Sequence, residues 1–433
     1  MSVFAKAPAS RSVRAVVTGV AMLGVSALLL TGCSGGANAP ADETDAPAAN
    51  SGDANPIEAG DRDLTLKIGT ILPQSGALAF LGPPEEAGVA LAVKDINDAG
   101  LGINVEAIFR DSGDTQTDTA TVSVTDLLSQ DVSAIVGAAS SGVSKTVIDQ
   151  ITGAGVVQFS PANTSAEFTD YSDNGLYFRT APSDVLQGEV LGNLIAEDGN
   201  STLGLIVLND AYGTGLAEYT TTAFEAAGGE VVATSLFNEG DSNFASQISE
   251  VTAANPDAIA LITFDQAKVV VPQLVGSGYP GDKLYFVDGN LSDYSADFAP
   301  GLVDGSKGTL PGLDTGTLGD FTDRLLEVDP GLQDYSYAAE SYDAVMLIAL
   351  AAYAANDVSG EKIAEYLQQV SGGTGDGKTV TDFTEAADLL KAGEQVDWDG
   401  FSGPITFDEN GDPTEATIGI YQYGADNTYA RIN

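Results

Sequence analysis

The sequence predicts an α/β protein made of two open, doubly wound lobes. Short apolar runs alternate with helical patterns along most of the 433 residues. Strands that alternate with helices of about 10 to 15 residues indicate βαβ units and parallel sheets. The alternation occurs in two series of roughly 120 residues each, a length typical of one domain. A hydrophobic content of 43% is sufficient for two cores.

The first series predicts the first lobe. We expect strands at 66–72, 103–109 and 134–136, and helices at 84–99 and 117–129. Ligands of doubly wound sheets bind outside the carboxyl ends of the strands. The loops that follow these strands are therefore the places to look for a site.

The second series predicts the second lobe, and the last third of the chain changes character. We expect strands at 203–208, 231–232, 258–262 and 284–287, and helices at 212–227 and 245–254. Helices at 335–354 and 361–370, a polar stretch at 371–400 and strands at 404–407 and 416–423 follow. The polar stretch has no role that the sequence reveals.

The N-terminus has the pattern of an export signal. Lys6, Arg11 and Arg14 precede an uncharged, mostly apolar run at 15–30, which is shorter than the roughly 20 apolar residues of a membrane span. The run ends in Leu30-Thr31-Gly32-Cys33, which resembles the lipobox of bacterial lipoproteins. We expect a signal peptide at 1–32 and a lipid anchor on Cys33, which would hold the protein at the outer face of the membrane. The alternative is an ordinary secretory signal beside an incidental cysteine.

Residues 33–63 predict a flexible acidic tether. They are rich in Ala, Asp, Gly, Pro and Asn and have no hydrophobic periodicity. Such a segment buries too little apolar surface to become ordered. We expect the folded body to begin near Leu64.

Composition excludes several function classes. With 17 Lys and Arg against 62 Asp and Glu, the net charge is -45, and phosphate backbones repel such a polyanion. The chain has no histidine, so it lacks the usual general base and the commonest metal ligand. A single cysteine excludes an intrachain disulfide. We expect no nucleic-acid partner, no cofactor and no metal.

Two motifs look like sites but lack the required context. Residues 372–379 match the phosphate-loop pattern, but a helix precedes them, and that loop needs a strand before it and a helix after it. Residues 408–412 suggest a calcium loop, but Pro413 occupies the position that requires glycine. We interpret this segment as a hairpin turn.

The order and spacing of several short segments resemble the leucine/isoleucine/valine-binding family of type I periplasmic binding proteins. The resemblance covers nearly all of 66–423 and extends to the ligand-binding domains of glutamate-type receptors. The segments are Ile68 to Gly76, Asp95-Ile96-Asn97, Gly137 to Ser141, Ser160 to Ser165, Arg179 to Asp184, Tyr212-Gly213, Asp288-Gly289, Tyr342-Asp343-Ala344 and Ser402 to Ile405.

The resemblance implies two Rossmann-like lobes joined by three crossovers that close over a ligand. Lobe 1 would comprise 64–183 and 314–402, and lobe 2 would comprise 184–313 and 403–433. The family also implies a monomer that delivers its ligand to an ABC-type permease.

Ser141 is the first candidate ligand contact. It stands directly before an apolar-periodic helix, where free N–H groups and the positive end of the helix dipole favour a carboxylate. The alternative is that Ser140 or Ser141 only caps this helix. By the resemblance, Thr164 would add a hydroxyl group for the carboxylate, and Ala162 a backbone carbonyl for the ammonium. The alternative for both is a strand-to-helix turn.

Asp288 is the candidate partner of a ligand ammonium group. It follows the strand at 284–287, at the end where ligands bind. In the receptor branch an aspartate in this context holds the ammonium, whereas in the leucine-binding branch the acid would correspond to Asn290. The alternative is a turn aspartate before glycine.

The resemblance also implies side chains that shape the pocket. Tyr212 and Phe264 match aromatic positions of the second lobe, and Leu81 replaces a tyrosine of the leucine binder. Ala139 and Ser140 are small. Asp184 matches a receptor-branch contact, although an aspartate at that place would also cap a helix.

We therefore expect an exported binding protein for an amino acid, with a branched-chain or other apolar side chain, that feeds an import permease. A sensor lipoprotein of the same fold, for a small amide or other polar metabolite, is the first alternative. The second is an exported hydrolase that uses carboxylates alone. No serine or cysteine nucleophile could be paired with a histidine, so we expect no enzyme.

Overall fold

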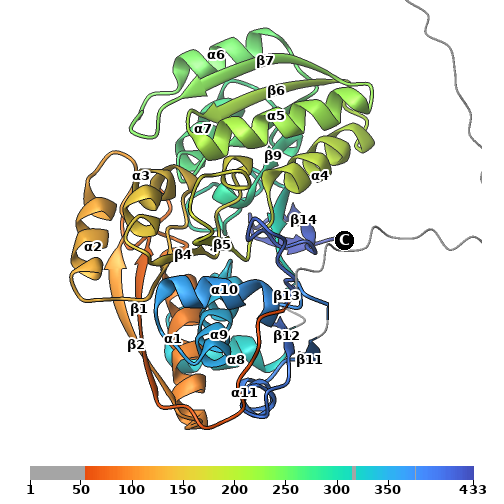
Figure 1. Cartoon of the computed structure of the whole chain (residues 1–433). Coiled ribbons are helices and arrows are strands. Elements are labelled where there is room, and N and C mark those ends of the chain that lie inside the picture. Colours follow the sequence, from red (N-terminus) through yellow and green to blue (C-terminus); the bar gives the residue numbers. More distant parts are fainter. Residues whose placement is uncertain (1–53, 315–317, 376) are drawn as a thin grey trace, which may run out of the picture. The chain divides into compact units, whose positions relative to one another are not determined.

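The computed structural model describes residues 54–314, 318–375 and 377–433, and these residues form two lobes (Figure 1). Lobe 1 combines elements from the first part of the chain, in orange, with elements from the last part, in blue. Lobe 2 is formed mainly by the middle of the chain, in green. The predicted signal peptide, Cys33 and the predicted tether up to residue 53 lie outside the described residues.

Lobe 1 contains a five-stranded parallel sheet. From edge to edge its strands are β2 (Ile103–Asp111), β1 (Leu64–Leu72), β3 (Ala134–Gly137), β4 (Val157–Ser160) and β5 (Tyr177–Arg179). Strands β3, β4 and β5 are buried along their whole length. Strands buried on both faces are characteristic of a doubly wound sheet, as the sequence predicts.

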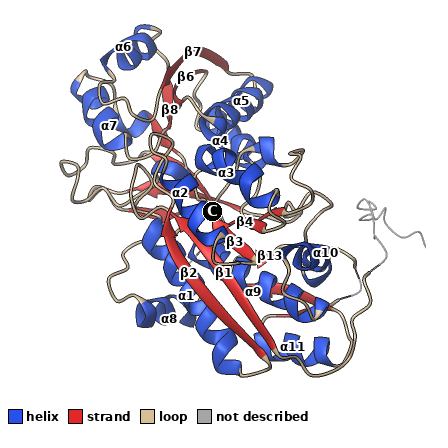
Figure 2. Cartoon of the chain, turned by 60° about the vertical axis from the view of Figure 1, so that its left-hand side comes forward, coloured by secondary structure: helices blue, strands red, loops and turns tan. Residues whose placement is uncertain are grey.

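Helices cover both faces of this sheet (Figure 2). One face packs against α2 (Thr119–Leu128) and α3 (Ser141–Thr152) through a cluster that includes Val124, Ile135 and Val147. The larger core lies on the other face and includes residues of α1 (Gly82–Ala99), α8 (Asp320–Val328), α9 (Ala338–Ala355) and α10 (Gly360–Val370).

Helix α9 is long and apolar enough to cross a membrane by length and composition, but 94% of it is buried inside the fold. It packs against α1 and α10. Among the described residues no other helix meets that length and composition. We interpret α9 as the central core helix of lobe 1.

Lobe 2 contains a seven-stranded sheet. Its order is β15 (Tyr429–Arg431), β14 (Ile418–Tyr423), β10 (Lys307–Pro311), β9 (Leu284–Phe286), β8 (Ala258–Ile262), β6 (Thr202–Leu208) and β7 (Glu230–Phe237). The strands from β10 to β7 are parallel, whereas β14 and β15 are antiparallel. The flanking helices are α4 (Asp184–Glu197), α5 (Ala211–Ala226), α6 (Ala245–Ala253) and α7 (Ala267–Gly276).

The polar stretch at 371–400 forms a small third sheet on lobe 1. Strand β11 (Lys378–Val380) pairs with β12 (Val396–Gly400), which pairs with β13 (Gly403–Pro404), and α11 (Phe383–Lys391) lies between the first two in sequence. Trp398 is buried and donates a hydrogen bond to Asp343 of α9 at 3.1 Å. Lys378 begins a strand and not a helix, so the phosphate-loop pattern lacks the geometry of a phosphate site.

The tether prediction was wrong for residues 54–63. Asn55 N donates to Gln369 Oε1 at 2.8 Å, and Arg62 Nε donates to the Tyr353 carbonyl at 2.8 Å. Gly60 N donates to the Lys391 carbonyl at 3.0 Å. These residues dock on lobe 1 through backbone and side-chain hydrogen bonds, which hydrophobic periodicity cannot reveal.

The predicted boundary at residue 403 was also wrong, because the chain stays in lobe 1 as far as Asp412. Ile405 and Phe407 belong to the lobe 1 core, and the rings of Phe407 and Phe178 lie 5.5 Å apart. Arg179 forms a bidentate ion pair with Asp412, with both contacts at 2.6 Å. The third crossover to lobe 2 therefore lies between Asp412 and the start of β14.

Candidate ligand-binding site between the lobes

A small cavity lies between the two lobes at the carboxyl ends of their strands. From lobe 1 come the loops after β3 and β4, and from lobe 2 the loops after β8 and β9, as expected for ligands of doubly wound sheets. The residues that line it are Leu78, Leu81, Ala139, Ser140, Ser141, Ala162, Tyr212, Phe264, Asp288, Gly289 and Tyr337. The structure thus brings together most of the residues that the sequence predicts.

The N-terminus of α3 forms one end of the cavity. Ser140 is the N-cap, and its hydroxyl oxygen accepts a hydrogen bond from Val143 N at 3.3 Å. Ser141 Oγ accepts from Ser165 N at 3.3 Å, so its own proton is available to another acceptor. The capping alternative therefore applies to Ser140, and the Ser141 hydroxyl group is available at the positive end of the helix.

Asp288 forms the other end of the cavity and collects three neutral donors. Tyr212 Oη donates to Oδ1 at 2.6 Å, Gln187 Nε2 donates to Oδ1 at 3.0 Å, and Tyr337 Oη donates to Oδ2 at 2.9 Å. Burial raises the pKa of Asp288, and these three hydrogen bonds oppose the increase because they favour the charged form. A lysine or arginine is absent from the described residues that line the cavity.

Asp184 supplies a second carboxyl group to this end of the site. Its side chain is buried, and neither oxygen has a hydrogen-bond partner in the described part of the chain. Burial and the nearby Asp288 raise its pKa well above the usual range. The Thr164 side chain and the charge of Arg179 oppose this increase. Asp184 and Asp288 make this end of the site acidic, and the described residues that line the cavity include no lysine or arginine, so this end is complementary to a positive charge.

An aromatic pair forms the apolar wall on the lobe 2 side. The rings of Tyr212 and Phe264 are stacked, with centroids 5.4 Å apart. Gly289 makes this approach possible, because a Cβ atom there would lie 2.8 Å from Phe264 Cδ1 and 3.0 Å from Tyr212 Oη. The glycine of the Asp-Gly motif is therefore required by close packing and not by a turn.

The two lobes are in direct contact around the cavity. Ser165 Oγ of lobe 1 donates to the Ala211 carbonyl of lobe 2 at 3.0 Å. Thr115 N donates to Glu239 Oε2 at 3.0 Å, and Asp265 N donates to the Ala77 carbonyl at 3.3 Å. These contacts define a closed arrangement. The free space between the side chains is only about 10 Å³, about the room that one water needs, so a larger ligand would enter only when the lobes move apart.

Three predicted residues do not line the cavity: Thr164, Asp184 and Asn290. Thr164 and Asp184 lie behind it, in contact with each other through the Asp184 N to Thr164 carbonyl bond at 2.6 Å. Asn290 is occupied locally, because Oδ1 accepts from Val287 N at 2.9 Å and Nδ2 donates to the Leu261 carbonyl at 2.7 Å. Between the two candidates for the ammonium group, the geometry favours Asp288.

Sequence reasoning missed four residues of the site: Leu78, Gln187, Gly289 and Tyr337. Tyr337 falls within the helix predicted at 335–354, but its φ of 59° makes it the N-cap of α9 and directs it out of the helix. Gln187 lies one turn after Asp184 on α4 and looks like an ordinary helical residue. The Asp288-Gly289 pair belongs to the segments that resemble the family, but the sequence does not show that Gly289 allows the close approach of Phe264 and Tyr212.

The segment at 408–412 behaves as the predicted turn. Asp408 Oδ1 accepts from Asn410 N at 2.8 Å and from Asp412 N at 3.1 Å. Asp412 is paired with Arg179. A group of acidic side chains suitable for a metal ion is absent from the described residues.

The protein has two doubly wound lobes and a small cleft between them. A helix N-terminus lies at one end of the cleft and the carboxyl group of Asp288 at the other. These features define the class of two-lobed solute-binding proteins. The chain belongs to the periplasmic binding protein family, whose sequence profile matches residues 65–428.

Relatives and solved structures agree with this assignment. The chain is 28% identical over 352 residues to a chemotactic signal transduction system substrate-binding protein of Halobacterium salinarum, covering 78% of this chain and 83% of the relative. It is 27% identical over 376 residues to a Leu/Ile/Val-binding protein homolog of Brucella suis, covering 84% and 92%. The branched-chain amino acid transporter substrate-binding protein LivJ of Streptococcus pneumoniae, solved with isoleucine, is similar in fold, with a TM-score of 0.67, 24% identity and coverage of 85% and 100%.

These findings confirm the predicted family and the predicted α/β fold of type I periplasmic binding proteins. The relatives are named as substrate-binding or Leu/Ile/Val-binding proteins, so the predicted class, a substrate-binding protein and not an enzyme, is confirmed and the hydrolase alternative is set aside. Membership of this family also implies that the folded body works outside the cytoplasm.

Proposed function

We propose that this protein captures an α-amino acid with an apolar side chain between its lobes and delivers it to an ABC-type import permease. The observation that carries the proposal is the opposite polarity of the two ends of the cavity. Ser141 and the N-terminus of α3 suit the α-carboxylate, while Asp288, backed by Asp184, suits the α-ammonium group. The stacked Tyr212 and Phe264 suit an apolar side chain.

The names of relatives support the same ligand class. A relative in Brucella suis is called a Leu/Ile/Val-binding protein homolog, and the similar Streptococcus pneumoniae protein was solved with isoleucine. A zwitterion that bridges lobe 1 and lobe 2 stabilises the closed form, which is the form a permease would recognise.

A melting-temperature panel with the mature chain tests the proposal. Leucine, isoleucine, valine or phenylalanine should raise the melting temperature, because a ligand at 100 times its Kd stabilises the folded state by about 2.7 kcal/mol. Sugars, polyols, dicarboxylates and uncharged amides at the same concentrations serve as controls. A panel in which one of these controls is active and every amino acid is silent would overturn the proposal.

The Ser141 hydroxyl group should contribute a charge-assisted hydrogen bond to the ligand carboxylate. Loss of such a bond costs about 1.5–3 kcal/mol, so Ser141→Ala should weaken the affinity by roughly 10- to 150-fold in calorimetric titrations. Thr164→Ala should have a smaller effect, because Thr164 does not line the cavity.

Asp382→Ala is the matched control for the Ser141 experiment. Asp382 caps α11 by accepting from Glu385 N at 3.0 Å, and it does not line the cavity. This variant should lose about 0.5–2 kcal/mol of stability with unchanged ligand affinity. Equal affinities of Ser141→Ala and the parent protein would show that Ser141 has only a structural role.

A lipid anchor on Cys33 would keep the protein beside its permease. The Leu30-Thr31-Gly32-Cys33 pattern motivates this part of the proposal. Cys33→Ser should release the protein from the membrane fraction, and intact mass should show acyl chains on the parent protein only. An unmodified Cys33 in the mature parent protein would overturn the anchor.

A sensory role is the second candidate, because one relative is named for a chemotactic signalling system. Uptake of a radiolabelled amino acid in cells with and without this chain separates the two roles. Unchanged uptake together with a lost chemotactic response would replace transport by sensing.

A further inference from the structure

A second, larger cavity lies on the hinge side of the ligand cleft and shares Tyr337 with it as a common wall. Its free volume is about 100 Å³, against about 10 Å³ for the cleft. Lobe 2 contributes strands β10, β14 and β15, and lobe 1 contributes the loop before α9 and the start of that helix. Any molecule in this cavity would therefore touch both lobes.

Glu340 of α9 lines this cavity, and the described residues that line it with Glu340 include no lysine or arginine. Its side chain is 6% exposed, and a backbone hydrogen bond of Glu340 itself favours the charged form of the carboxyl group. The carboxyl group lies against Gly312, where a Cβ atom would come within 2.6 Å of Oε1. The φ of 107° at Gly312 keeps a side chain out of this space.

Acidic side chains and one arginine, Arg431, lie near Glu340. Burial, with a smaller contribution from Asp343, raises the pKa of Glu340 to about 8, and the backbone hydrogen bond opposes this increase. Glu85, buried on α1, also faces it. Arg431 is not among the lining residues, and its guanidinium group donates to the Gly312 carbonyl at 3.2 Å and to Asn433 Oδ1 at 3.1 Å. A buried carboxyl group in this situation stays protonated or takes up a cation.

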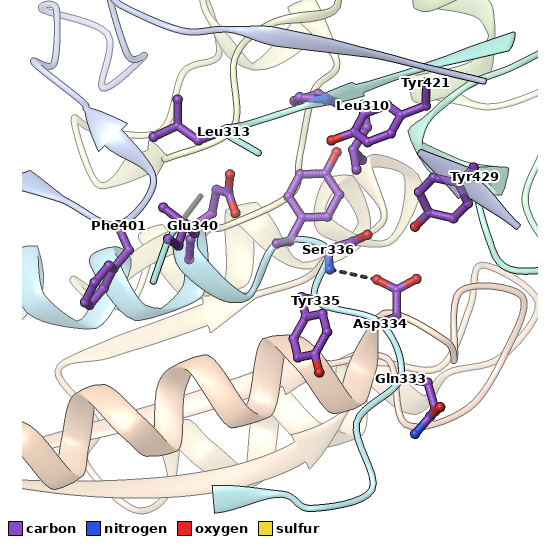
Figure 3. A pocket seen from close by; sticks show the side chains of 14 residues that line it. Leu310, Leu313, Gln333, Asp334, Tyr335, Ser336, Glu340, Phe401, Tyr421 and Tyr429 are labelled. Carbon is purple, nitrogen blue, oxygen red and sulfur yellow. Dashed lines mark hydrogen bonds between the residues drawn. The ribbon is translucent and has the colours of Figure 1, made fainter. Parts of the chain in front are cut away.

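Aromatic rings form part of the remaining walls, together with aliphatic and polar side chains. Figure 3 shows Glu340 on one side of the cavity and the rings of Tyr421 and Tyr429 on the other, with Asp334 bonded to Ser336 N at 2.7 Å. Aromatic faces beside a carboxylate attract organic cations through their ring quadrupoles. The described residues that line the cavity include no lysine or arginine.

We propose that the hinge cavity binds a small aliphatic ammonium ion, with Glu340 as its counter-charge and Tyr421 and Tyr429 as its aromatic walls. This ligand class differs from the zwitterion of the cleft. An ammonium ion that contacts both lobes favours the closed arrangement, and Tyr337 links the two cavities through its hydrogen bond to Asp288. Occupancy should therefore raise amino-acid affinity several-fold, and the amino acid should raise amine affinity by the same factor.

Titration calorimetry with n-butylammonium chloride tests the proposal, with sodium chloride at equal ionic strength as the blank. The mature parent protein should show saturable one-to-one binding that leucine does not displace. Glu340→Gln keeps the shape but removes the charge, and it should weaken amine binding by at least about 100-fold. Asp288→Asn is the control in the cleft, and it should retain amine binding.

A second measurement needs no variant. Because Glu340 is mostly protonated near pH 7 in the empty protein, ammonium binding should release close to one proton, seen as a dependence of the binding enthalpy on the buffer's ionisation enthalpy. Absence of saturable amine binding, unchanged binding in Glu340→Gln, displacement by leucine, or binding without proton release would each overturn the proposal. Amine binding that is lost only in Asp288→Asn would assign the amine to the cleft instead.

Discussion

Asp288→Asn should nearly abolish amino-acid binding while leaving the protein folded. The substitution keeps the shape of the side chain, and Oδ1 can still accept from Tyr212 and Gln187. It removes the charge that pairs with a buried ammonium group, a loss of about 2–5 kcal/mol. Calorimetric titration should therefore show an affinity roughly 30- to 5,000-fold weaker.

Asp343→Asn is the matched control for this experiment. Asp343 is also a buried aspartate with several donors: it accepts from Trp398 Nε1 at 3.1 Å, from Phe401 N at 3.2 Å and from Ser402 N at 2.6 Å. It does not line the cleft. This variant should lose stability and keep its affinity. Tight amino-acid binding by Asp288→Asn would remove Asp288 from the ligand-binding role.

The parts of the site that follow a strand in sequence could be predicted from the sequence. Ser141, Ala162, Phe264 and Asp288 each come shortly after a buried strand, and parallel strands place their carboxyl ends at one edge. Apolar runs locate the strands, and the order of the short segments identifies the family. The sheet geometry then brings these residues together without knowledge of any side-chain contact.

Residues that reach the site from elsewhere could not be predicted in this way. Gln187 contacts Asp288 across 101 positions of sequence, and its helical setting gives no sign of the contact. Tyr337 reaches the cavity because its backbone has a positive φ, which a tyrosine does not signal. Both contacts depend on tertiary packing, which propensity and periodicity do not encode.

Contacts with residues that are distant in sequence explain the errors in the predicted boundaries at residues 64 and 403. Asn55 and Arg62 are held on lobe 1 mainly by hydrogen bonds, so the segment lacks an apolar pattern. The Arg179–Asp412 ion pair holds the residues after 403 on lobe 1. Ile405 and Phe407 of that segment belong to the lobe 1 core, and an apolar pattern predicts a strand without showing which lobe the strand joins.

The buried acids should make the empty protein less stable as the pH rises from 6 to 8. The chain has no histidine, and ordinary carboxyl groups are ionised throughout this range. The side chains that titrate between pH 6 and 8 are therefore mainly carboxyl groups whose pKa values are raised. The pKa of Glu340 is about 8 in the folded state because of burial, against about 4.3 when unfolded. The folded state therefore binds more protons than the unfolded state, and stability falls as the pH rises.

Urea unfolding at pH 6, 7 and 8 and constant ionic strength should reveal this loss. One carboxyl group with these pKa values lowers the free energy of unfolding by about 2 kcal/mol between pH 6 and 8. Burial also raises the pKa values of Glu85 and Asp184, so these groups lower the stability in the same direction. Glu340→Gln should be the more stable protein at pH 8 and should have a shallower pH dependence, whereas Asp382→Ala should keep the parent slope. A parent protein whose stability is constant or increases from pH 6 to 8 would show that Glu340 is ionised in the empty fold, and that a charge already present in the chain compensates it.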